Sequence, residues 1–263
     1  RDMKAILAKL IRADELLLNL AREVREFEAS LSPPRVDKGY KSGTSTYAFF
    51  AHGDVEVPLR FAVLAGEVVH QLRSSLDHLI AHVVFSQGGA VTRVHQFPIC
   101  STQENYQHAV ARGCLEGVPV RLQRRIEGCQ PFNMEDPRVS ELLVVQELNN
   151  LDKHRLLVVV AAAARVGQSI RVSCGEDATI TGMSPPNLRP RDGSEFFSID
   201  FARRYDQTDV DIDVQSQVAL QRPTVLNWPF DFVPLVFALE QVSRAVHQVV
   251  GACLHEAEAT NTV

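Results

Sequence analysis

The stretch RVGQSIRVSC, residues 165–174, decides the fold class, because the spacing of apolar residues changes there. Before it, apolar side chains recur every three or four residues, as on one face of an α-helix. Within it, Ile170, Val172 and Cys174 alternate with polar residues, which is the period of a strand with one buried face. The sequence therefore predicts a helical part that is followed by antiparallel strands.

The same alternation recurs twice further along the chain. The alternating apolar residues are Phe197, Ile199 and Phe201, and then Val210, Ile212 and Val214. A long loop, MSPPNLRPRDGS at 183–194, separates these strands from the first one. We therefore expect a small antiparallel sheet within residues 167–226, inserted before the last helix.

Long helices are expected on both sides of this insertion. Their ranges are about 2–28, 59–86, 137–165 and 231–257. Asp231 is the expected N-cap of the last helix, and the apolar run LLVVVAAAA at 156–164 is read as the buried end of the third. Shorter helices are expected near 102–112 and 118–128, and a β-hairpin over 46–58 that turns at His52-Gly53-Asp54.

These elements predict one α+β domain over residues 1–263. Its core is a bundle of four long helices, built from residues 1–30, 59–165 and 229–257. A β-hairpin follows the first helix, and the small antiparallel sheet precedes the last one.

Composition narrows the class of protein. The net charge is −5, so no overall basic field favours nucleic acid, and nothing points to DNA. The five cysteines are odd in number and none has a CxxC spacing, which favours a reducing compartment, the cytoplasm, over a disulfide scaffold or zinc ribbon. No apolar run approaches the ~20 residues of a membrane span.

The helix expected over 59–86 has two different faces. Its apolar face consists of Val68, Leu72, Leu76, Leu79 and Val83, and the opposite arc holds Glu67, His70, Ser74, Asp77 and His78, with Arg73 at its edge. This arc contains no lysine and collects side chains that titrate or bind metals. It is either a solvated face or one wall of a site.

The helix expected over 137–165 places polar residues inside an apolar stripe. Glu147, Asn150 and His154 have the spacing i, i+3, i+7 and fall among leucines and valines. A buried carboxylate is unfavourable unless it is paired or bound to a metal. Either structural partners satisfy these groups, for example an arginine for Glu147, or the bundle contains a polar site.

A metal site is one form that such a site could take. Glu240 and His247 of the last helix are also seven residues apart, so three helices can each direct a carboxylate and an imidazole inward. The candidate ligands are Glu67, His70, His78, Glu147, His154, Glu240 and His247. Fe, Mn or Zn would suit them, although Glu67 to His70 is one copy of a Glu-x-x-His motif of which di-iron bundles use two.

Other catalytic signatures are absent from the sequence. There is no phosphate-binding P-loop, no dinucleotide-binding glycine fingerprint, no Gly-x-Ser-x-Gly, no His-Glu-x-x-His and no EF-hand loop.

Two motifs, HQLRSSLDHL at 70–79 and ELNNLDKHRLL at 147–157, resemble those of a widespread family of uncharacterised bacterial proteins. Phe97-Pro98-Ile99 and Gln130-Pro131-Phe132 match two shorter segments of the same family. The resemblance covers about residues 60–160 and implies no known activity.

The segment from Arg73 to His78 is also similar to the Arg-x(4–6)-His motif of HEPN domains. That resemblance implies a metal-independent RNA endonuclease of the defence or toxin type, acting as a homodimer without a cofactor. Arg73 would then stabilise phosphate charge and His78 would act as general acid or base. Ser74 replaces the usual Asn or Asp, and the motif lies in the second long helix rather than the last.

The sequence thus leaves three functions open. The first is the HEPN-like ribonuclease, with RNA as substrate and catalytic candidates Arg73, His78, His70, Asp77, Glu147 and His154. The second is a metal-dependent enzyme that uses the seven candidate ligands. The third is a non-catalytic ligand-binding or interaction module, in which the polar cluster is structural.

Overall fold

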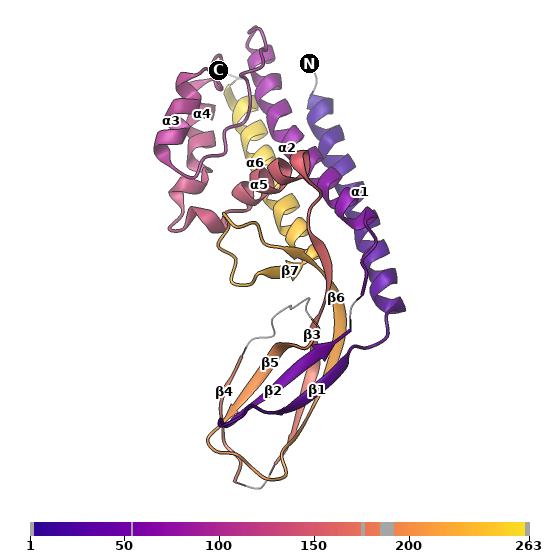
Figure 1. Cartoon of the computed structure of the whole chain (residues 1–263). Coiled ribbons are helices and arrows are strands. Elements are labelled where there is room, and N and C mark those ends of the chain that lie inside the picture. The colour runs from indigo at the N-terminus through magenta and orange to yellow at the C-terminus, as the bar shows by residue number, and fades with distance from the viewer. Residues whose placement is uncertain (1–2, 54, 175–176, 185–191, 261–263) are drawn as a thin grey trace.

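The computed structural model describes residues 3–53, 55–174, 177–184 and 192–260. Figure 1 shows an elongated molecule with the helices at one end and most of the strands at the other. The long strands β3 and β6 run between the two ends, and α3 and α4 lie to one side of the long helices.

Six α-helices of the described residues belong to the helical end. They are α1 (Met3–Ser30), α2 (Arg60–Ser86), α3 (Gln103–Ala111), α4 (Val120–Gly128), α5 (Glu141–His154) and α6 (Leu235–Thr260), with two short 3-10 turns at Pro131–Asn133 and Pro137–Val139. Apolar residues recur every three or four positions in α1, and this spacing buries one face of the helix against α2 and α6. Among the described residues, no helix is both long and apolar enough to cross a membrane.

In the part of the chain that the structure describes, seven strands form two antiparallel sheets. They are β1 (Arg35–Tyr40), β2 (Thr46–His52), β3 (Val159–Ser173), β4 (Ile180–Met183), β5 (Ser194–Phe201), β6 (Asp209–Gln221) and β7 (Phe232–Pro234). The first sheet has the order β1-β2-β5-β4 and the second the order β3-β6-β7. Phe49 pairs with Phe197 across β2 and β5, and Val159 pairs with Leu220 across β3 and β6.

The two ends of the molecule have separate hydrophobic cores. The helical core is the larger, and Val218 and Leu220 at the end of β6 belong to it. The second core lies between the sheets and is rich in aromatic rings, with Phe49 at its centre. Val214, earlier in β6, belongs to this second core, so β6 connects the two.

The predicted bundle of four long helices is wrong. The third long helix does not extend over 137–165: α5 ends at His154, and the chain becomes β3 at Val159. The physical reason is the run of β-branched valines at 158–160, whose restricted χ1 angles suit a strand that has a partner. β6 supplies that partner from Val159 to Ser173, with two register shifts along the way.

The predicted hairpin forms from other residues. β2 covers 46–52 and pairs with β1, which the sequence did not indicate, and the turn between them contains Gly43 with φ +72°. Asp54 of the predicted turn lies outside the described residues. Because β2 also pairs with β5, the hairpin belongs to a sheet that draws strands from both before and after the middle helices.

The predicted start of the last helix is also displaced. Asp231 does not cap α6, which begins at Leu235 after the short strand β7. Its carboxylate instead accepts a hydrogen bond of 2.9 Å from Arg222. The shorter helices α3 and α4 confirm the expectations near 102–112 and 118–128.

The second core should contribute strongly to stability, and Phe49 tests this. Phe49 is 0% exposed, so Phe49→Ala should lower the free energy of unfolding by about 3–5 kcal/mol through lost burial and a residual cavity. Phe237→Ala is the matched control, because Phe237 is 57% exposed. Urea denaturation measures both, and equal effects would contradict the assignment of Phe49 to a core.

Candidate functional site

Helices α2 and α5 face each other through polar residues. Gly66 of α2 lies directly against the carboxylate of Asp152, and a Cβ atom at position 66 would overlap that carboxylate. Seven residues further along α2, Arg73 donates to Gln146 at 3.0 Å. Since the contact on α5 moves backwards as the contact on α2 moves forwards, the two helices run in opposite directions.

Arg73 is the centre of this polar contact. Its side chain is buried, and beyond Gln146 it donates to Asp77 at 2.6 Å and to the backbone carbonyl of Phe97 at 3.0 Å. Asp77 in turn accepts from the backbone N–H of Phe97 at 2.9 Å. Arg73 therefore joins α2, α5 and the segment around Phe97, which is a structural use of the guanidinium.

The other candidates on α2 do not converge with those on α5. Glu67, His70 and His78 are exposed, and His70 and Glu67 are close enough to Asp152 to shift its pKa in opposite directions. Burial is the largest influence on that pKa and raises it. Among the described residues, the polar contacts of α2 with α5 involve Gln146 and Asp152, and not the predicted Glu147 and His154.

The remaining candidates are dispersed. Glu147 is half-buried and makes no hydrogen bond or ion pair with any described residue, and burial raises its pKa. His154 and Glu240 are exposed. His247 contacts Asp14 of α1 at 3.1 Å. Within the described part of the chain, no group of three or more His, Cys, Asp or Glu side chains is arranged to hold a metal ion.

A different set of residues lines a surface groove between α2, α3 and the segment 93–100. The groove has a volume of about 650 Å³. Its polar lining consists of Arg73, Arg93, Gln96, Asn105, His108, Arg112 and Gln146, together with the thiols of Cys100 and Cys114. None of the described lining residues is an aspartate or a glutamate, although the chain as a whole is acidic.

The loop that carries Arg93 is held in place by His95. The buried ring of His95 accepts from the backbone N–H of Thr92 at 2.9 Å and donates to the carbonyl of Glu116 at 3.1 Å. Val94 packs on Gly113, whose φ of +90° ends the turn after α3. These contacts bring Arg93 close to the end of α3.

The opposite side of the groove is held by Gln130. Its side chain is 1% exposed, accepts from the backbone N–H of Cys100 at 3.0 Å and donates to the carbonyl of Pro98 at 2.8 Å. The segment 97–100 is therefore fixed by Arg73 on one side and by Gln130 on the other. A groove with such fixed walls is preorganised for a ligand.

The charges of the groove are not neutralised by its own lining. Arg93 and Arg112 are exposed and form no hydrogen bond or ion pair through their side chains with any described residue. The thiols cannot balance them, because burial raises the pKa of Cys100 and raises that of Cys114 to about 11. Both thiols are therefore protonated at neutral pH.

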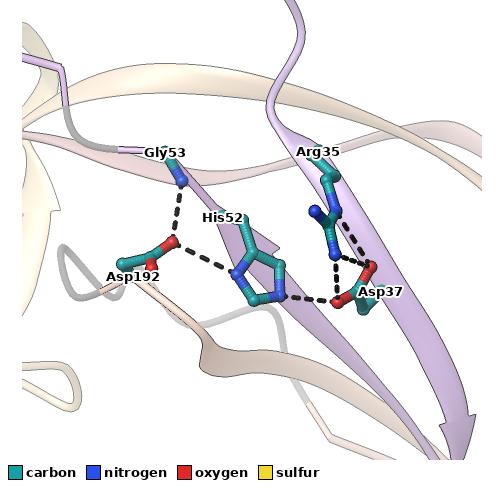
Figure 2. A network of polar contacts seen from close by, with 5 residues as sticks. All are labelled: Arg35, Asp37, His52, Gly53 and Asp192. Carbon is teal, nitrogen blue, oxygen red and sulfur yellow. Dashed lines mark hydrogen bonds and ion pairs between the residues drawn. The ribbon is translucent and has the colours of Figure 1, made fainter.

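A second polar cluster lies at one end of the first sheet. Figure 2 shows His52 between two carboxylates, with Asp37 at 2.9 Å and Asp192 at 3.2 Å. Arg35 pairs with Asp37, and the backbone N–H of Gly53 donates to Asp192 at 3.0 Å. The cluster fastens the ends of β1 and β2 where the chain passes to and from the helices.

Sequence reasoning missed the groove. Arg93, His108 and Arg112 lie in the region 90–136, which has no long apolar period to organise a prediction. Comparison of the chain with protein-family models, curated protein sequences and solved structures finds no match. The family resemblances stated above therefore rest on their motifs alone.

The structural role of Arg73 can be tested by stability. Arg73→Ala removes three hydrogen bonds, leaves Asp77 without its counter-charge and leaves the Gln146 Oε1 without its donor, so the free energy of unfolding should fall by about 2–4 kcal/mol. Arg124→Ala, on the exposed face of α4, should change it by less than about 0.5 kcal/mol. A Tm equal to wild type for Arg73→Ala would show that the network does not support the fold.

Substitution of Glu147 should raise the stability of the protein, whereas substitution of Arg73 should lower it. Because burial raises its pKa in the folded state, ionisation of Glu147 lowers stability as pH rises from the unfolded pKa, near 4.3, through the raised folded pKa. Glu147→Gln should therefore stabilise the protein at neutral pH, by at most about 1 kcal/mol since the group is partly exposed. Below about pH 4 the two proteins should melt together.

Thermal melts from pH 3 to 8 measure this difference, with His154→Gln as a control on the exposed end of α5. A lower Tm for Glu147→Gln at pH 7 would indicate that Glu147 has a stabilising partner.

Proposed function

We propose that this protein is a ligand-binding module that holds a small phosphate-bearing anion in the groove between α2 and α3. The observation that carries the proposal is the pair Arg93 and Arg112, two exposed guanidiniums that line one groove and have no carboxylate partner among the described residues. Arginine suits this task because its planar set of N–H donors can bind two oxygens of a phosphate at once.

The neighbouring side chains support the same ligand. His108 lies on α3 one helical turn before Arg112 and offers an N–H donor even when it is neutral. Arg73 uses three of its five N–H groups within the protein, and its charge is balanced by Asp77. The groove therefore offers two uncompensated positive charges, which match a phosphate monoester dianion.

This proposal corresponds to the ligand-binding module among the three functions expected from sequence. The ribonuclease expectation draws less support from the geometry, because Arg73 is occupied by Asp77, Gln146 and Phe97. RNA cleavage in EDTA that disappears in His78→Ala would favour the ribonuclease instead.

The absence of any disulfide among the five cysteines supports a reducing compartment, and we propose the cytoplasm.

Binding of inorganic phosphate tests the proposal. Calorimetric titration at low ionic strength should show saturable binding, and Arg93→Ala and Arg112→Ala should each weaken it about tenfold or more. A charge-assisted hydrogen bond contributes about 1.5–3 kcal/mol, and 1.4 kcal/mol is a factor of ten. Both arginines are exposed, so both variants should keep the wild-type Tm.

Arg124→Ala is the matched control, because it removes an exposed arginine that does not line this groove. Equal weakening in Arg124→Ala and Arg112→Ala would show that phosphate responds only to net charge. No saturable binding by the wild-type protein would overturn the proposal.

A further inference from the structure

We infer that the natural ligand of the groove is a nucleoside monophosphate, for which adenosine monophosphate is the probe. This inference rests on the proposed function and goes further by assigning the organic part of the ligand. The properties of the lining that support it are the volume of the groove, its amide side chains and its apolar surface.

The groove is larger than a phosphate ion needs. Its volume of about 650 Å³ lies in the usual range for sites that hold small organic molecules, about 300–1,000 Å³. If the phosphate binds Arg93 and Arg112, most of the groove remains for the group that is esterified to it. An inorganic anion would leave that space to water.

Three amide side chains also line the groove. They are Gln96 on the loop after α2, Asn105 on α3 and Gln146 on α5. The Oε1 atom of Gln146 is taken by Arg73, which leaves its NH₂ group as a donor. The side chains of Gln96 and Asn105 are exposed and bonded to no described residue, so each offers a donor and an acceptor.

An amide with both functions pairs well with a nucleobase edge. Asparagine and glutamine bind adenine through two hydrogen bonds, one to the exocyclic amine and one to a ring nitrogen. The apolar part of the lining, Val94, Pro98, Ile99 and Ala109, can contact the flat faces of the base. The groove thus presents apolar surface and hydrogen-bonding amides together, as a base requires.

The nucleobase is the part of the ligand that we expect to add affinity beyond that of the phosphate, because amide side chains and apolar surface both line the groove. Ribose 5-phosphate carries the same sugar and phosphate without the base, and therefore measures what the base adds.

A four-ligand titration tests the inference. Inorganic phosphate, ribose 5-phosphate, adenosine and adenosine monophosphate are titrated separately into the chain of residues 1–263. Adenosine monophosphate should bind at least tenfold more tightly than ribose 5-phosphate. Asn105→Ala and Gln96→Ala should each weaken adenosine monophosphate about fivefold or more and leave inorganic phosphate unchanged, whereas Arg112→Ala should weaken both.

Gln107→Ala is the matched control, because Gln107 is an exposed amide on α3 that does not line the groove. Equal affinities for adenosine monophosphate and ribose 5-phosphate would overturn the inference while the phosphate-binding proposal stands. Equal loss in Gln107→Ala and Asn105→Ala would also overturn it. Failure of inorganic phosphate to bind would overturn the proposed function itself.

Discussion

The buried guanidinium of Arg73 is the interaction on which the helical end depends. One side chain bonds to its own helix through Asp77, to α5 through Gln146 and to the segment before α3 through Phe97. A buried charge is tolerated only when it is paired and its donors are used, so these three elements must stay in register with one another. The same contacts hold one wall of the groove between α2 and α3, because Arg73 and Gln130 together fix the segment 97–100.

The junction between the two ends of the molecule depends on strand pairing rather than on helix packing. β6 contributes side chains to both hydrophobic cores, and Val218 near its end donates its backbone N–H to Glu28 in the last turn of α1. β3 pairs with β6 from Val159 to Ser173, with two register shifts. Two paired strands therefore connect the helical part with the sheets.

The amphipathic pattern of α2 predicted the helix and its buried leucines, and the structure confirms both. The same pattern indicated that His70, Asp77 and His78 share one arc, yet only Asp77 joins a polar network. On α5 the apolar stripe suggested a paired or ligated Glu147, but the residues that meet α2 are Gln146 and Asp152. Gly66 makes that approach possible because it has no Cβ.

The sequence by itself determined the amphipathic helices, the strand periods of β5 and β6 and the mixed α+β class, because these follow from local spacing of apolar residues. Only the tertiary structure decided that the valines after His154 form a strand, since a strand depends on a partner, here β6, more than fifty residues away. The groove between α2 and α3 also depends on tertiary contacts. Arg93 and Arg112 line it together because His95 holds the loop of Arg93 and Val94 packs on the turn at Gly113. The spacing of residues along the chain does not predict these contacts.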